Sequence, residues 1–555
     1  MLPGGRRPAL VLPSALILLI ALLAALVVLP LLRLVQVVYQ EAGHSHSGIV
    51  DPAALGTAIR NTVVLAAAVT ATAVPVGAAL ALVLRRADLP GRPFWRVAVL
   101  VPVLVPDFVL GYSWTQAYAR AGFTDTLLGL HWAAVQGAVG VWVVLVVNAA
   151  PLAYLMVAVA LAARGEPDLE RAARVSGAGP GTALVSVTLR LALPALAAAS
   201  ILVFVLTLGA FAIPQVLGEP GGFSTVTTRI YADLSLGGDA SSFVEAIALA
   251  LALVVVALVC VAPADALLAP RLRSVRPADN QGLPALPARP GMRQAQALAL
   301  GGYLVLTAGL PLAALVLSSV TRALGLPPTP ANWTAAHFQE VLTPRTLEAL
   351  GRSLGLAIAA ATVLVVLGGA VAVVERRRAG RAVATMLTLT LVLPGSALAV
   401  ALLIAYGRWL SGSLLLILLA YLAKLWALAH RPISGALDRL PPDEQRAARA
   451  SGARALTAVR TVVLRPLAPA LAGAWLVCFL TALHEVTMSS LLYGPGTETF
   501  AVVVLNSEEL GRIGPTAALC VVLVLVVTVP ALLLLLAARL LRVRRNAAPR
   551  VMRVA

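Results

Sequence analysis

The sequence predicts an all-α, polytopic membrane protein with about twelve transmembrane helices in two homologous six-helix halves. Hydrophobic residues make up 60% of the chain and charged residues only 12%, about half the charged share of a soluble protein. Apolar runs of about twenty residues, long enough to cross a bilayer, recur from one end of the chain to the other. The segment ERAARVSGAG at 170–179 returns as QRAARASGAR at 445–454, which indicates an internal duplication.

The apolar runs define the individual helices. Each is long enough to cross about 30 Å of hydrocarbon. The first is longer than the apolar core of a signal peptide and has no small-residue cleavage site, so it is interpreted as a retained span. The predicted spans are 9–38, 58–84, 97–117, 134–163, 191–216, 243–268, 296–320, 348–374, 382–406, 411–430, 466–493 and 514–538.

The basic residues set the predicted orientation. The formal net charge is +18, but the arginines gather in every second connection between apolar runs, as in cytoplasmic loops of membrane proteins. This distribution predicts a multi-pass membrane protein with both termini cytoplasmic and the lipid bilayer as its surroundings. It also makes a nucleic-acid partner unnecessary.

The duplication divides the chain into halves at 1–270 and 296–555, joined by a cytoplasmic linker at 271–295 that is rich in Pro, Arg and Ala. The matching segments lie 275 residues apart around the repeated stretch. The offset is 288 where Pro106 meets Pro394, and 291 where ALVLRR (81–86) meets AVVERR (372–377). Such a drift between segments is typical of duplication followed by small deletions in loops.

The repeated stretch predicts a helix, a sharp turn and a second helix on the cytoplasmic face. Arginines alternate with alanines at helical spacing, and Gly177 and Gly452 can adopt positive φ at the turn. Pro194 and Pro469 follow seventeen residues later, where the chain is expected to re-enter lipid. An amphipathic helix that only lies on the membrane surface is the alternative, which the presence of two copies makes less favourable.

This pattern resembles the EAA loop of ABC importer permeases. In that family the loop forms a coupling helix that docks on the ATPase subunit, so the resemblance implies two ABC ATPase partners, with coupling loops at 164–190 and 431–465. Gln445 departs from the usual acid, and Arg190 and Arg465 replace a frequent proline. The residues that match, together with the neighbouring acid of the second loop, are Glu170, Ala172, Ala173, Gly177, Glu444, Gln445, Ala447, Ala448 and Gly452.

More of the chain resembles the fused two-half permeases of the ferric-iron importer type. The stretches that carry this resemblance are LVPVLVPDFVLGYSW (100–114), FAIPQVLGEPGGFSTVTTRIYADL (211–234), AYLAKLWALAHRPISGALDRLPPDEQRAARASGA (420–453) and LHEVTMSSLLYGPGTETFAVVVL (483–505). It implies the type I ABC importer permease fold, a location in a bacterial cytoplasmic (inner) membrane, an external (periplasmic or lipid-anchored) solute-binding protein, and ferric iron as substrate. Thiamine, a polyamine, a phosphonate or another small solute remain alternatives, as does an ion-coupled secondary transporter.

The sequence contains no sign of an enzyme. A P-loop needs a lysine after a glycine, but the only lysine, Lys424, follows Ala423, so ATP must be hydrolysed by a separate subunit. The three cysteines stand in apolar runs without metal-ligand spacing. No catalytic, metal or cofactor site is predicted.

Ionisable residues inside apolar runs are candidates for the translocation path, because burying charge in a bilayer is costly. For Lys424, a structural ion pair or an extension towards the cytoplasmic surface is the alternative. Pro106 and Pro394 are expected to kink paired helices. The candidate path residues are Asp107, Glu245, Lys424, His484 and Glu485.

Overall fold

The computed structural model describes residues 8–44, 52–86, 89–164, 167–237, 239–273, 290–376 and 378–547. These residues are helical apart from their connections and one isolated β-bridge between Thr321 and Trp333. Part of the linker, 274–289, lies outside the described residues, and its two ends are helical.

The first part of the chain contains long helices separated by short ones. Elements marked η are π-helical or 3-10 turns. In order they are α1 (Pro8–Leu23), η1 (Ala24–Val28), α2 (Leu29–His44), α3 (Pro52–Arg86), α4 (Arg92–Ala98), α5 (Val101–Leu104), α6 (Asp107–Tyr118), α7 (Phe123–Leu128), η2 (Ala133–Val135), α8 (Ala138–Arg164), α9 (Pro167–Val175), α10 (Pro180–Ala183), η3 (Leu184–Leu189), α11 (Arg190–Leu208), η4 (Pro214–Gly218), η5 (Glu219–Gly221), α12 (Val226–Ser235) and α13 (Ala240–Arg273).

The second part has a similar sequence of elements. They are α14 (Pro290–Leu304), η6 (Val305–Gly309), α15 (Leu310–Val320), η7 (Pro330–Asn332), α16 (Ala336–Val341), α17 (Pro344–Val374), α18 (Arg378–Val392), α19 (Gly395–Leu410), α20 (Leu414–Leu437), α21 (Pro442–Ala450), α22 (Ala455–Ala458), η8 (Val459–Leu464), α23 (Arg465–Leu483), α24 (Thr487–Leu492), α25 (Phe500–Glu509) and α26 (Ile513–Ala547).

Ten helices of the described residues are long and apolar enough to cross a membrane, and one bent pair would make an eleventh. They correspond to every predicted span except 97–117, which is wrong as a single helix. The chain there is divided among α4, α5 and α6. Val105 is extended (ψ 130°) before Pro106, because proline excludes the preceding residue from the helical region.

The predicted span 382–406 is broken at the matching proline. Helices α18 and α19 meet at 108°, and Pro394 is extended (φ −61°, ψ 142°) at the start of α19. Pro106 has a similar conformation (φ −53°, ψ 138°) at the start of α6. Where the sequence predicts a kink at each proline, the structure therefore has a complete break.

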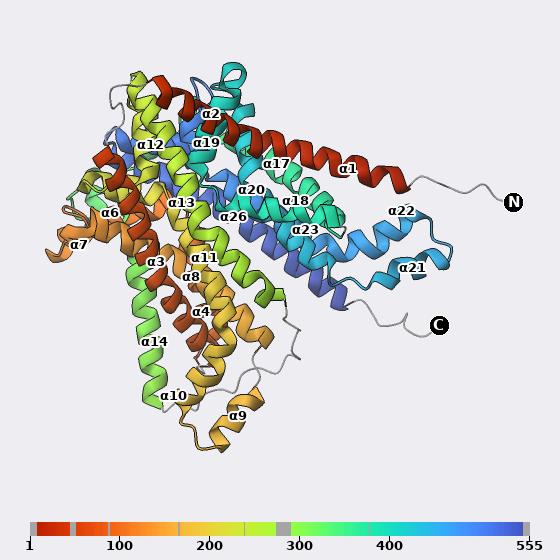
Figure 1. Ribbon diagram of the computed structural model, residues 1–555. Coiled ribbons are helices and arrows are strands. Elements are labelled where there is room, and N and C mark those ends of the chain that lie inside the picture. Colours follow the sequence, from red (N-terminus) through yellow and green to blue (C-terminus); the bar gives the residue numbers. More distant parts are fainter. Residues whose placement is uncertain are drawn as a thin grey trace.

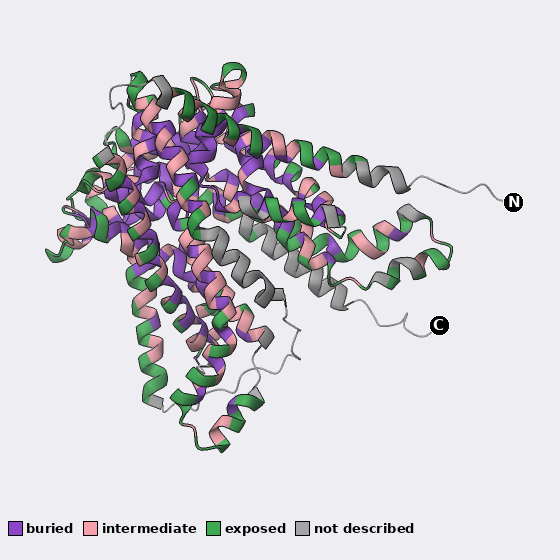
Figure 2. Ribbon diagram, in the orientation of Figure 1, coloured by how far each residue is buried: buried purple, intermediate pink, exposed green. Residues whose placement is uncertain are grey.

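The helices form two arms that diverge from a common apex (Figure 1). One arm contains α3, α8 and α11 and ends at α9 and α10. The other contains α17, α20 and α23 and ends at α21 and α22. Buried residues concentrate where the arms join, and exposed ones increase towards the two ends (Figure 2). The apex is therefore the common core of the molecule.

The first helix of each half packs against the other half. Helix α1 contacts α17 and α18, and α15 contacts α6. Backbone carbonyls of the π-helical turns within these helices accept hydrogen bonds across the interface. Tyr406 Oη donates to Ala25 O in η1 at 2.6 Å, and the equivalent Tyr118 Oη donates to Leu306 O in η6 at 2.5 Å. The packing of the first helix of each half against the other half is therefore repeated, down to an equivalent tyrosine hydrogen bond.

Glycines allow the closest helix pair of each arm. A Cβ added at Gly77 in α3 would lie 2.6 Å from Ala153 Cβ in α8. One added at Gly368 in α17 would lie 3.1 Å from Ala429 Cβ in α20. Small residues allow helix backbones to approach this closely in membranes, where association depends on packing. Each arm therefore contains an equivalent helix pair in which a glycine allows the close approach.

Candidate functional site

The first repeated stretch forms a helix that ends in a glycine turn at the end of one arm. Gly177 follows α9 with φ +89°. Its N–H donates to Arg174 O at 3.0 Å, and the N–H of Ala178 donates to Ala173 O at 3.0 Å. These two bonds satisfy carbonyls that the helix end would otherwise leave free. The chain then enters α10, η3 and α11.

The second stretch repeats this turn at the end of the other arm. Gly452 follows α21 with φ +86°, its N–H donates to Arg449 O at 3.0 Å, and Ala453 N–H donates to Ala448 O at 3.1 Å. The predicted positive-φ turns are confirmed at both glycines. Pro194 and Pro469 lie inside helices α11 and α23, a few residues after each helix begins, and their expected position at the return to lipid stays a prediction.

The predicted coupling residues differ in how far they are buried within the protein. Glu170 is only 1% exposed and accepts a hydrogen bond from Thr188 Oγ1 at 3.2 Å, so its carboxylate faces the protein. The side chain of Gln445 lies outside the described residues. Two of the remaining residues are half-buried, Ala173 and Ala448, and the others are exposed: Ala172, Gly177, Glu444, Ala447 and Gly452.

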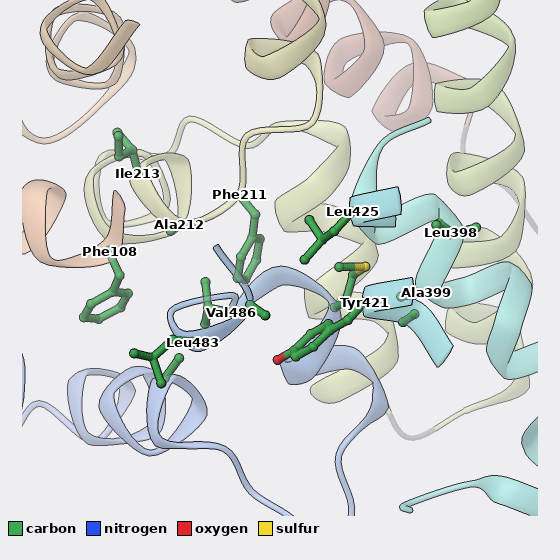
Figure 3. Packing of buried hydrophobic residues seen from close by; sticks show 14 of the residues in the cluster. Phe108, Phe211, Ala212, Ile213, Leu398, Ala399, Tyr421, Leu425, Leu483 and Val486 are labelled. Atoms are coloured by element: carbon green, nitrogen blue, oxygen red, sulfur yellow. The ribbon is translucent and has the colours of Figure 1, made fainter. Parts of the chain in front are cut away.

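A cavity of about 290 Å³ lies between the two halves near the apex. It is lined by residues next to the chain breaks of α6, α11 and α23, among them Asp107 of the first half and His484 and Glu485 of the second. Phe108, Phe211 and Val486 also line it, and together with Leu483 they belong to the buried apolar cluster shown in Figure 3. The structure therefore brings three of the five predicted path residues together.

The two carboxylates of the cavity are held differently. Asp107 Oδ1 accepts a bond from Asn148 Nδ2 at 3.0 Å, and Asp107 is exposed to the cavity. Glu485 accepts bonds from the backbone N–H groups of Met488 at 2.9 Å and Ser489 at 3.1 Å, at the start of α24. The cavity thus has two anchored acidic groups, one from each half.

The polar lining belongs to one side of the pseudo-symmetric pair. At the sequence offsets of the duplication, Asp107 corresponds to Gly395, and His484 and Glu485 correspond to Gly209 and Ala210. Gly209 and Ala210 also line the cavity, but they contribute no ionisable side chain to it. The ionisable lining therefore comes from Asp107 on one side and from His484 and Glu485 on the other.

Lys424 and Glu245 lie elsewhere. Lys424 Nζ donates to Leu391 O at 3.1 Å and to Leu393 O, so it satisfies carbonyls at the C-terminal end of α18, where a cation is also favoured by the helix dipole. Glu245 Oε1 accepts a bond from Arg229 at 2.9 Å. Neither residue is among those that line the cavity, and the place of each in the translocation path stays a prediction.

Sequence reasoning missed two polar groups. Asn148, which holds Asp107, is uncharged, although an asparagine in the apolar run 138–162 was a usable signal. His430 and Glu375 form a pair at 2.9 Å between α20 and the end of α17. Among the described residues, no group of three or more His, Cys, Asp or Glu side chains could hold a metal ion.

Comparison with known proteins identifies the family. Residues 73–274 and 364–544 each match the family described as "Binding-protein-dependent transport system inner membrane component". The chain is therefore a transporter subunit of the multi-pass inner-membrane kind, with the two-half type I permease fold, rather than an enzyme.

Three relatives illustrate the range of solutes. The putrescine transport system permease protein PotI of Escherichia coli K12 is 30% identical over 193 residues, 33% of this chain and 69% of the relative. The molybdenum transport system permease protein ModB of Escherichia coli K12 is 31% identical over 189 residues, 33% and 82% of the two chains. The putative 2-aminoethylphosphonate transport system permease protein PhnV of Salmonella typhimurium LT2 is 26% identical over 223 residues, 39% and 83%.

Each family match contains one glycine turn, and together the matches cover more than half of the chain. The protein belongs to the family of binding-protein-dependent transport system inner membrane components, the permeases of ABC importers.

Proposed function

We propose that this chain provides both halves of the membrane pathway of an ABC importer, and that two separate ATPase subunits dock on α9 and α21. The observation that carries the proposal is the pair of equivalent glycine turns, one at the end of each arm. A movement imposed on both turns at once would change the angle between the arms. Such a change would expose the cavity to one side of the membrane or the other.

The orientation follows from the same arrangement. The arm ends carry the arginine-rich connections, so they face the cytoplasm together with both termini and the linker. The apex then faces outward, where an external solute-binding protein would deliver its substrate. The halves meet the binding protein at the apex and the ATPases at the arm ends.

The substrate we propose is a small cation, with ferric iron as the first candidate. The sequence resemblance to ferric-iron permeases favours iron, and the two carboxylates Asp107 and Glu485 in the cavity favour a positively charged solute over an oxyanion. A diamine such as putrescine is the second candidate, because PotI is among the relatives. The carboxylates make molybdate a less suitable substrate.

The test is transport into proteoliposomes that contain the full-length chain, its ATPase and its binding protein. Uptake of radioactive ferric iron is compared with uptake of putrescine and of molybdate. ATP-dependent uptake of iron is expected, with a loss of at least about tenfold for Asp107→Asn combined with Glu485→Gln. Glu348→Gln, an acidic residue whose side chain is 68% exposed, should transport like the unaltered protein.

Three results distinguish the possibilities. Uptake of putrescine but not iron would replace the first candidate by the second. Uptake of molybdate, unaffected by the two carboxylate substitutions, would contradict the cationic substrate. No ATP-dependent uptake of any solute, together with no ATPase binding, would contradict the importer itself.

A further inference from the structure

The two glycine turns have the same backbone but different outward side chains. We infer that the ATPase contact at α9 is stronger than the one at α21, because α9 presents a leucine and a valine at the positions where α21 presents a glutamate and an alanine. The inference rests on the proposed function, since it presupposes that ATPases dock on both turns.

Glu170 defines which face of α9 is turned outward. Its carboxylate is buried against Thr188, and successive residues of an α-helix advance by about 100°. Residues one, two and five positions away, Leu169, Ala172 and Val175, therefore lie on the sides facing away from the protein. Their exposure agrees with this geometry: Leu169 is 46% exposed, Val175 is 89% exposed and Ala172 is exposed. We call these three residues the outer face of α9.

The outer face of α21 is less apolar. At the offset of 275, Leu169 corresponds to Glu444, Ala172 to Ala447 and Val175 to Ala450. All three second-half residues are exposed. A leucine and a valine that become buried against a partner contribute favourable free energy, whereas burying a carboxylate without a partner is unfavourable. The two faces therefore differ most in the apolar area that they offer an identical or similar partner.

The two docking helices also differ in how they are held on the side that faces the protein. The hydrogen bond from Thr188 to Glu170 fixes α9 against the turn η3. The equivalent of Thr188 is Val463, whose side chain has no hydrogen-bonding group, so this anchor cannot form in the second half. A docking element that is already held in place loses less conformational freedom on binding. The first turn is thus both more apolar outside and better anchored inside.

The occupant that fits the outer face of α9 is a protein rather than lipid. The helix that follows the turn runs from Pro180 to Leu208, 29 residues. It is roughly 43 Å long, more than the roughly 30 Å of hydrocarbon in a bilayer. Asp168, which lies on the same outward side of α9, and the neighbouring Arg171 are 81% and 64% exposed. Asp168 does not distinguish the two turns, because its equivalent, Asp443, is also an exposed acid. The outer face therefore extends beyond the hydrocarbon, at an end of the arm where the family's cytoplasmic partner must bind.

The test exchanges the outer faces between the two turns. One variant carries Leu169→Glu and Val175→Ala, which gives α9 the side chains of α21. The matched variant carries Glu444→Leu and Ala450→Val, which does the reverse. The affinity of each full-length protein in nanodiscs for the purified ATPase subunit of its transport system is measured, with melting temperature and elution profile as controls for folding.

We expect the first variant to bind the ATPase at least about tenfold more weakly, and the matched variant to bind as well as the unaltered protein or better. Equal losses in both variants, or no loss in the first, would overturn the inequality. A loss of folded protein in nanodiscs without any change in ATPase affinity would instead assign the outer face to lipid and also overturn it. If the unaltered protein does not bind the ATPase, the proposed function fails rather than this inference.

Discussion

Asp233 is a buried carboxyl group whose surroundings make ionisation unfavourable. It is 8% exposed and lies in α12, outside the membrane-crossing helices. Its Oδ1 is 3.7 Å from Arg229, whose nearer partner is Glu245 at 2.9 Å, and its Oδ2 has no partner among the described residues. Burial raises the pKa of Asp233 to about 6; Arg229 opposes the rise, and Glu245 and Asp239 add to it.

The sign of the effect on stability follows from this raised pKa. Because the folded-state pKa exceeds the ordinary value of about 4, the protonated carboxyl stabilises the fold. That stabilisation is fully present below about pH 4 and is lost as the pH rises through about 6. At pH 8 the ionised carboxylate therefore costs the folded state about 1–3 kcal/mol relative to a neutral group.

We predict that Asp233→Asn raises the melting temperature at pH 8 and changes it little at pH 4.5, because asparagine is neutral at both values. The measurement is thermal unfolding in detergent at the two pH values. Asp239→Asn serves as the control, since Ser241 and Ser242 donate to this carboxylate and hold its pKa below the ordinary value; it should give no gain at pH 8. An equal gain for Asp233→Asn at both pH values would refute the ionisation argument.

At the scale of elements, both glycine turns and every span except 97–117 and the broken 382–406 could be predicted, because each depends on local composition. A run of apolar residues must cross the membrane as a helix, and a glycine after a helical stretch of alanines and arginines favours a positive-φ end. The breaks before Pro106 and Pro394 were less predictable. Proline specifies that the helix is disturbed, but packing against the other half decides whether it kinks or ends.

The candidate site was predicted only in part, for a related reason. The pattern located Asp107, His484 and Glu485 in apolar runs, but it could not place them in one cavity, because that depends on how the two halves meet. Nor could it show that Glu170 faces inward. The equivalent glutamine and valine at 445 and 463 become informative only once the contact of Glu170 with Thr188 is known.

The glycine turn itself leads to a prediction about α9. Gly177→Ala should destabilise the turn by roughly 1 kcal/mol, because a Cβ disfavours positive φ. The φ of Gly177 is +89°, and no neighbouring atom lies within 4 Å of the added methyl group. Hydrogen exchange of the Gly177 and Ala178 amides should then become roughly fivefold faster. Gly179→Ala is the matched control, because Gly179 has φ −63° and equally open surroundings. Equal acceleration in both variants would show that φ is not the cause.

At the scale of the whole molecule, each arm combines elements from both halves. The first helix of each half packs on the other half, and Tyr118 and Tyr406 donate across the interface to π-helical turns. The buried residues concentrate at the apex, whereas the arm ends are separate and more exposed (Figure 2). A packed apex with separate ends is suited to rotation of the arms about the apex, with the broken helices at Pro106 and Pro394 next to the axis.

This arrangement predicts that ATP binding by the docked ATPases brings the arm ends together. Thr182 in α10 and Thr457 in α22 are exposed, equivalent positions on the two ends, so spin labels at Thr182→Cys and Thr457→Cys report their separation. Cys260 is exposed and is replaced by serine, whereas Cys478 and Cys520 are buried. Pulsed electron paramagnetic resonance should give a shorter distance with ATP than without it, because the proposed function has one pair of ATPases move both turns. Labels at Thr182→Cys and Arg190→Cys lie on one continuous helical segment and should keep their distance, which separates arm movement from local unwinding. An unchanged distance between the arm ends in a complex that hydrolyses ATP would contradict alternating access by arm rotation.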